Sequence, residues 1–181
     1  FYGCSSLQEI TIPESVIEVG ISAFYNCDNL RTVTINHGYI MATAFGYCDN
    51  LSEINFGKYY DTTGDGRDYL FHESFPFKGC QNISTITGYC GESAYWTLSG
   101  SLDEGFLLEI DGTGSTWNYD SHNSATTRRP LFSLWSSYIN TAVIGSGIQT
   151  VGDGLLRWLS KLQKLTVMDG VEYLGADLCS G

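Results

Sequence analysis

Hydrophobic residues recur along this chain at fixed offsets from a short motif, Phe-x-x-Cys-x-x-Leu. The motif or a close variant of it begins at Phe1, Phe24, Phe45 and Phe77. Behind the motif, apolar residues alternate with polar ones, as at Ile10 and Ile12, at Val33 and Ile35, and at Ile54 and Phe56. Such alternation is typical of a strand with one buried face. The pattern therefore predicts short strands near residues 10–12, 33–35 and 54–56.

The spacing of the motif predicts a stack of repeated units. Phe1 and Phe24 are 23 residues apart, Phe24 and Phe45 are 21 apart, and Phe45 and Phe77 are 32 apart. The third interval is longer because a polar segment, residues 58–68, is inserted into a turn while the apolar frame is kept. Units of about 20 to 29 residues cannot bury their own apolar side, so they stack and share one core.

The repeat resumes near the end of the chain. Residues 148–152 and 171–175 are 23 apart and match residues 16–20. Each of these segments ends in a glycine: Gly20, Gly152 and Gly175. A backbone bend or a positive φ would favour glycine there, although Met41 stands at the equivalent place in the shortened unit.

Residues 89–138 break the repeat. Two alternating stretches, residues 96–98 and 108–114, are separated by a glycine-containing segment, which predicts a β-hairpin. Two interpretations of the segment stay open: a structural insert that continues the core between repeat blocks, or a binding platform. We therefore expect an N-terminal repeat block over residues 1–88, a β-rich spacer over 89–138 and a C-terminal repeat block over 139–181.

The repeat resembles a known family. Phe24-x-x-Cys27-x-x-Leu30-x-x-Val33-x-Ile35, preceded by Ile12-Pro13-x-x-Val16-x-x-Val19-Gly20-x-x-Ala23, closely resembles the BspA-like, or Treponema-type, leucine-rich repeats. The likeness covers roughly residues 1–56, 71–88 and 139–181. It implies a right-handed leucine-rich-repeat solenoid of the α/β horseshoe class, mainly short β-strands with little helix, here interrupted by the insert that contains the hairpin.

The resemblance also implies a function and a location. Proteins of this family lie on the surface of bacteria and some protists, or are secreted, and act in adhesion and host-protein binding. The expected partner is thus an extracellular protein of the host matrix or of a neighbouring cell. Two alternatives stay open: a passive spacer that presents other domains of a larger surface protein, and a glycan-binding module.

Charge narrows the range of partners. Twenty acidic residues against nine basic ones give a formal net charge of -11, and no tract of Lys or Arg is present to neutralise phosphates. Nucleic acid is therefore not an expected partner. No apolar run approaches the roughly 18 residues that a membrane-spanning helix needs, so no insertion into a membrane is expected of this chain. Because the chain opens without Met and stops inside a repeat unit, we expect it to be part of a longer protein.

An aromatic and basic cluster lies between residues 117 and 138 of this acidic chain. Its candidate partner-binding residues are Trp117, Tyr119, Arg128, Arg129, Trp135 and Tyr138. Aromatic residues and arginine are favoured anchors of protein interfaces. Aromatic side chains are also an ordinary means of burying an irregular segment, so core packing is the alternative interpretation.

Four of the six cysteines, Cys4, Cys27, Cys48 and Cys80, hold the same repeat position. Stacking places such residues in a column with a spacing of about 4.8 Å, within the Cα reach of a disulfide. One cysteine per unit beside a phenylalanine nevertheless favours buried, free thiols that pack as small hydrophobic groups. A bridge from Cys80 to Cys90 is the weaker alternative, and the spacing does not predict a zinc site.

One segment resembles half of a calcium loop, with Asp61, Thr63 and Asp65 as alternating oxygen ligands near a glycine turn. The alternative is a solvated turn rich in Asp, Thr and Gly. The chain has no Gly-x-Ser-x-Gly elbow and no His-Glu-x-x-His motif, and its three histidines lie in different segments. We therefore expect no catalytic activity and no cofactor.

Overall fold

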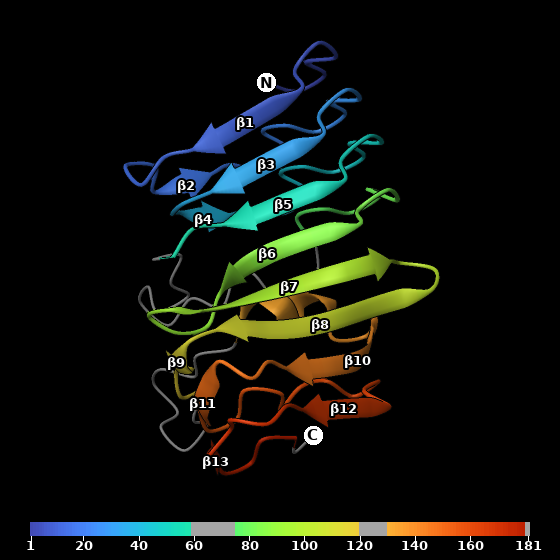
Figure 1. Ribbon diagram of the computed structural model, residues 1–181. Coiled ribbons are helices and arrows are strands. Elements are labelled where there is room, and N and C mark those ends of the chain that lie inside the picture. Colours follow the sequence, from blue (N-terminus) through green and yellow to red (C-terminus); the bar gives the residue numbers. More distant parts are fainter. Residues whose placement is uncertain (59–74, 120–129, 180–181) are drawn as a thin grey trace. The chain divides into compact units, whose positions relative to one another are not determined.

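A computed structural model describes residues 1–58, 75–119 and 130–179 (Figure 1). The chain forms two compact units, Phe1–Ile86 and Thr87–Gly181, and each is considered by itself. The second unit contains both the expected spacer segment and the expected C-terminal repeat block.

In the first unit, one short strand of each repeat pairs in parallel with the strand of the next repeat (Figure 1). These strands are β1 (Glu9–Ile12), β3 (Thr32–Ile35) and β5 (Glu53–Phe56). Ile10 pairs with Val33, and Val33 pairs with Ile54, so that equivalent positions of successive repeats lie in register. A second parallel pair joins β2 (Glu18–Val19) and β4 (Tyr39–Ile40). The strands that the alternation predicts are thus confirmed.

The register turns repeated apolar positions into columns of side chains that are buried from the second repeat onward. The rings of Phe1, Phe24, Phe45 and Phe77 stack in order with centroid distances of 5.2, 5.1 and 5.4 Å. Beside them lie further buried columns, with members 0 to 1% exposed: Cys27, Cys48 and Cys80; Leu30, Leu51 and Ile83; Val33, Ile54 and Ile86. The core of this unit therefore consists of the repeat positions that the sequence marks.

The turn before each strand contains a residue whose backbone is in the left-handed conformation, with a positive φ. The residue that precedes the column cysteine has a positive φ in all four turns: Gly3 (69°), Asn26 (60°), Tyr47 (53°) and Gly79 (82°). Glycine and asparagine adopt this conformation readily, whereas a tyrosine there is strained. The ring of Tyr47 lies over Gly79, where an added Cβ would come within 2.7 Å of Tyr47 Cδ1.

In the second unit, a long antiparallel pair leads into parallel strands. β7 (Ala94–Ser101) pairs antiparallel with β8 (Gly105–Gly112), from Ala94 opposite Gly112 to Ser101 opposite Gly105. β8 pairs in parallel with β10 (Ile139–Ile144), which pairs in parallel with β12 (Lys164–Val167). A smaller parallel sheet has the order β13–β11–β9 and is made of these strands: β9 (Gly114–Ser115), β11 (Ile148–Val151) and β13 (Tyr173–Leu174). β6 (Thr85–Tyr89) bridges the unit boundary in sequence.

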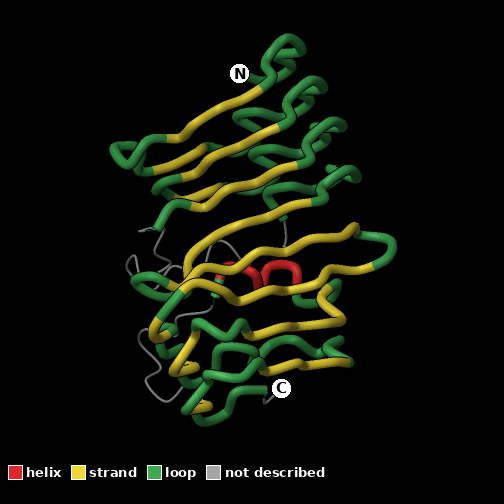
Figure 2. Tube along the Cα trace, in the orientation of Figure 1, coloured by secondary structure: helices red, strands yellow, loops and turns green. Residues whose placement is uncertain are grey.

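Helix is scarce, as expected. In the described ranges the structure gives one helical segment, the 3-10 helix η2 (Leu131–Trp135), drawn in red in Figure 2. Phe132 of this helix packs edge-on against Trp96 of β7, with the ring centroids 5.6 Å apart. Both rings are fully buried, so η2 fills the core beneath the antiparallel pair. No described helix is long and apolar enough to span a bilayer.

The repeated glycines have a different role from the expected positive φ. Gly20, Gly152 and Gly175 do not have a positive φ, so of the two reasons expected for glycine here, a backbone bend or a positive φ, the second is wrong. At Gly152 an added Cβ would collide with the backbone carbonyl oxygen of Trp117. At Gly20 nothing lies within 4 Å of such a Cβ. Close approach of the neighbouring backbone therefore requires glycine in the second unit but not in the first, which agrees with Met41 at the equivalent position.

Candidate functional site

The aromatic cluster expected to bind a partner divides into buried and accessible residues. Tyr119 is 4% exposed and Trp135 is fully buried. A partner of the folded chain cannot contact these two side chains, so the partner-binding hypothesis is corrected for them in favour of core packing. Trp135 belongs to η2, whose neighbouring Phe132 contacts Trp96. Arg128 and Arg129 lie outside the described residues.

Trp117 and Tyr138 remain accessible. Trp117 is half-buried, and its backbone N–H donates a hydrogen bond of 2.6 Å to the carbonyl oxygen of Cys90. Tyr138 is 40% exposed, and its carbonyl oxygen accepts a hydrogen bond from the N–H of Phe106 at the start of β8. Both residues thus have a fixed backbone and a side chain that reaches solvent, which keeps them as candidate contact residues.

The calcium candidate, with Asp61, Thr63 and Asp65, lies outside the described residues. Elsewhere, the described ranges hold no group of three or more His, Cys, Asp or Glu side chains arranged to bind a metal ion. His37 is the one histidine within these ranges, and its Nδ1 lies 3.2 Å from the carbonyl oxygen of Val16. That contact places His37 in a turn between repeats.

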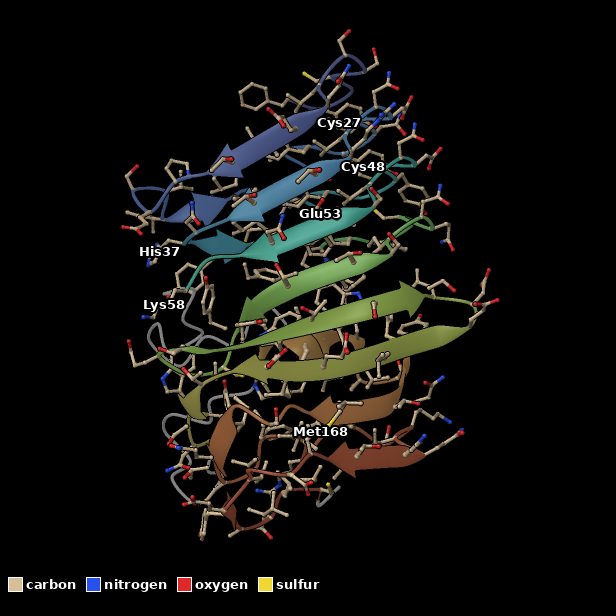
Figure 3. The ribbon with its side chains drawn as sticks, viewed as in Figure 1. Cys27, His37, Cys48, Glu53, Lys58 and Met168 are labelled. Atoms are coloured by element: carbon tan, nitrogen blue, oxygen red, sulfur yellow. The ribbon has the colours of Figure 1, made fainter. Side chains whose placement is uncertain are left out.

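The column cysteines are free thiols with a shared hydrogen-bonding pattern. All six cysteines are unbridged, so the Cys80 to Cys90 alternative is wrong. The thiols of Cys27, Cys48 and Cys80 each donate a hydrogen bond to the carbonyl oxygen of a phenylalanine in the preceding turn, at 3.3, 3.1 and 3.0 Å. Cys27 and Cys48, labelled in Figure 3, come from the turns that precede β3 and β5. The expectation of buried free thiols is confirmed for these three residues, whereas Cys4 is half-buried.

The environment of Cys27, Cys48 and Cys90 keeps these buried thiols protonated, whereas the neighbouring Cys48 thiol lowers the pKa of Cys80. Burial raises the pKa of Cys27 and, more strongly, the pKa of Cys90. The neighbouring Cys80 thiol, and then burial, raise the pKa of Cys48. Because the thiolate is the nucleophile and the metal ligand, these positions favour structure over chemistry.

The outward face of the parallel strands in the first unit carries short polar side chains in rows. Glu9, Thr32 and Glu53 face one another across β1, β3 and β5, and Thr11, Thr34 and Asn55 form the next row. All six side chains are exposed or half-buried, and Glu53 is labelled on β5 in Figure 3. The amide of Asn55 donates a hydrogen bond of 2.8 Å to Glu53 Oε1. This face offers polar groups at a regular spacing to a partner.

The outward face of β7 and β8 in the second unit has a different chemistry. Tyr95 stands opposite Asp111, and Thr97 stands opposite Glu109. Tyr95 is 44% exposed, and both carboxylate residues are exposed. The sequence pattern predicts strands here but does not by itself point to this face. The available signal was the alternation itself, because every second residue from Tyr95 and from Glu109 points away from the core.

A column of tyrosines on the turns of the first unit was also missed. Tyr2 stacks on Tyr25 with a centroid distance of 5.2 Å, and Tyr25 lies 5.3 Å from Tyr47. Tyr2 is 68% exposed and Tyr47 is 41% exposed. Burial and the neighbouring phenols of Tyr47 and Tyr2 raise the pKa of Tyr25. The signal was a tyrosine one or two residues after the motif phenylalanine in three successive turns.

Comparison with models of protein families agrees with the arrangement of repeats in the first unit. Residues 1–87 match the family model for the BspA type leucine rich repeat region, in six copies. Among solved structures, the chain is similar to a leucine-rich repeat protein from Bacteroides ovatus, to which it is 20% identical, with a TM-score of 0.32. The similarity covers 94% of this chain and 45% of that chain, so this chain spans less than half of that protein's length. Comparison with curated proteins finds no match.

Proposed function

We propose that this chain, whose residues 1–87 match the model of the BspA type leucine rich repeat region, is a protein-binding module. It acts in adhesion at the bacterial surface or after secretion. Its partner is an extracellular protein of the host matrix or of a neighbouring cell. Within each unit the repeats stack as a right-handed solenoid, which the antiparallel pair interrupts in the second unit.

The observation that carries this proposal is the regular polar face of β1, β3 and β5 in the repeat region. Its backbone groups are hydrogen-bonded to neighbouring strands, so the face is rigid. Its side chains, among them Thr34 and Asn55, are short. A rigid surface of short side chains loses little conformational entropy when a partner binds, which favours affinity. Extended surfaces of stacked repeats are commonly used for such binding.

The proposal is tested by equilibrium binding of the purified chain to immobilised extracellular-matrix proteins, including fibronectin, laminin and collagen, followed by biolayer interferometry. Saturable binding to at least one of them is expected. Thr34→Arg places a long charged side chain in the centre of the polar face without touching the core, so it is expected to weaken that binding at least about tenfold, the scale of a hot-spot loss.

The matched control is Glu14→Arg, which adds the same side chain to an exposed turn of the same unit. Its affinity is expected to stay within about twofold of the parent, as for substitutions outside an interface. Absence of saturable binding to every protein of the panel would instead favour the passive spacer. Equal losses of affinity in Thr34→Arg and Glu14→Arg would show that the polar face is not the binding surface.

A further inference from the structure

We propose that the outward face of β7 and β8, centred on Tyr95, Glu109 and Asp111, binds a positively charged extended segment of a partner protein. This inference rests on the proposed protein-binding function and names the chemistry of one partner. Its occupant is a strand-like segment with Lys or Arg at alternate positions.

The geometry of the face comes from the pairing of the two strands. Tyr95 is directly opposite Asp111 and Thr97 is directly opposite Glu109, so a phenol ring and two carboxylates share one face. Inward-facing Trp96, Leu108 and Ile110 are fully or almost fully buried, which fixes the outward direction of their neighbours. β8 is paired on both sides, with β7 and β10, so its carboxylates are held in the interior of a sheet.

The charge of this region is unbalanced. Residues 87–119 contain five carboxylates and no Lys or Arg: Glu92, Asp103, Glu104, Glu109 and Asp111. The residues across from Glu109 are Thr97 on β7 and Val143 on β10, neither of which is charged. The first basic residue along this sheet is Lys164 on β12, paired with Thr141 of β10. Opposite charges across strands stabilise a sheet, and this face lacks them within the described residues.

The spacing of the carboxylates sets the form of the ligand. Glu109 and Asp111 are two residues apart on one strand face, which places their Cα atoms about 6.6 Å apart. Basic side chains at alternate positions of an extended peptide have the same spacing, so two can reach the two carboxylates together. The ring of Tyr95 beside Asp111 offers a cation a second attraction, because ammonium and guanidinium groups bind to aromatic faces.

Asp111 is already partly oriented for this role. Its Oδ1 accepts a hydrogen bond of 2.7 Å from the N–H of Gly112, which leaves its other oxygen for a ligand. Gly145 lies close to the same carboxylate, since an added Cβ there would come within 2.9 Å of Asp111 Oδ1. The carboxylate is thus positioned by backbone rather than by a charged side chain.

The test uses the whole chain and a fluorescein-labelled peptide of alternating Lys and Thr, eight residues long, with fluorescence anisotropy at low salt. Saturable binding is expected, and it weakens as salt is raised because exposed ion pairs are screened. The double variant Glu109→Gln, Asp111→Asn keeps the shapes and the Asp111 acceptor while removing both charges. It is expected to bind about tenfold more weakly, since each exposed ion pair contributes roughly threefold.

The matched control is the double variant Glu14→Gln, Glu18→Gln, which removes two exposed charges from the first unit. Its affinity is expected to match the parent. Tyr95→Ala is expected to weaken binding about threefold through loss of the cation–π contact. Equal losses of affinity in the two double variants would show that the net charge of the chain alone attracts the peptide, and this would overturn the proposal. Absence of binding by the parent would overturn it as well.

The outcomes separate this inference from the proposed function. Binding to a matrix protein without binding to the basic peptide would support the protein-binding function and reject the role of the β7–β8 face. Binding to the peptide without binding to any matrix protein would support the role of the β7–β8 face and reject the proposed class of partner.

Discussion

The thiol of Cys48 donates a hydrogen bond of 3.1 Å to the carbonyl oxygen of Phe24, one repeat earlier. The ring of Phe24 in turn stacks on the ring of Phe45, three residues before Cys48. One buried cysteine therefore links the backbone of one turn to the side-chain stack of the next. The same link recurs from Cys80 to Phe45, so each turn is tied to its neighbour in this way.

Cys48→Ala is expected to destabilise the chain. The substitution removes a buried sulfur and leaves the Phe24 carbonyl without this donor, and together these losses cost about 1 to 3 kcal/mol. The measurement is the free energy of unfolding from a urea titration followed by circular dichroism. Ser5→Ala is the control, because Ser5 is exposed in an equivalent turn and its loss is expected to be small. Equal stability of Cys48→Ala and the parent would contradict the role of the thiol.

Phe45→Ala and Phe1→Ala change the same repeat position in two different environments. Phe45 is fully buried between Phe24 and Phe77, whereas Phe1 is 75% exposed. Phe45→Ala is expected to cost about 3 to 5 kcal/mol, as for a buried phenylalanine. Phe1→Ala is expected to cost less than about 1 kcal/mol, since surface changes usually have small effects. A similar loss in both variants, measured by urea unfolding, would contradict the stacked arrangement.

Gly79→Ala tests the left-handed turn. Gly79 has a φ of 82°, and a Cβ there would lie 2.7 Å from Tyr47 Cδ1, so both the backbone and the contact oppose a side chain. A cost of about 1 to 3 kcal/mol is expected. Gly20→Ala is the matched control, because nothing lies within 4 Å of its added Cβ. A lowered melting temperature for Gly79→Ala alone is the expected result, and equal melting temperatures for the two variants would contradict it.

Stability is expected to fall at alkaline pH through Cys90. Burial raises the pKa of Cys90 above the ordinary value of 9.0, so the folded chain keeps this proton after the unfolded chain has lost it. The contribution is fully present below about pH 9 and is lost as the pH rises further, at up to about 1.4 kcal/mol per pH unit.

The measurement compares urea unfolding of the parent and of Cys90→Ala from pH 7 to pH 11. The variant starts from a lower stability because Cys90 is fully buried, but its decline above pH 9 is expected to be shallower. Parallel declines in the two proteins would exclude Cys90 as the source.

Much of the first unit could be predicted from the sequence, because its repeats are short and locally encoded. The motif phenylalanines and cysteines form the stacked columns, and the alternating residues after them lie in β1, β3 and β5. A pattern of this kind reports burial directly, since each position meets its own equivalent in the next repeat.

The candidate site was harder to predict, because partner contact depends on exposure rather than on residue type. Trp135 and Tyr138 are both aromatic and three residues apart, yet Trp135 is fully buried and Tyr138 is 40% exposed. The difference arises from the packing of η2 beneath β7, a non-local contact that no local pattern encodes. The face of Tyr95 and Asp111 similarly depends on the register of two strands, which is set by their turn.

Adhesion itself is tested most directly with microspheres that carry the folded chain, counted after flow over surfaces coated with extracellular-matrix proteins. Microspheres coated with Thr34→Arg and with albumin provide the comparison. Retention of the parent-coated microspheres well above both of these is the result that a protein-binding repeat module predicts. Retention of the parent no greater than that of albumin on every surface would contradict it and leave the chain as a spacer.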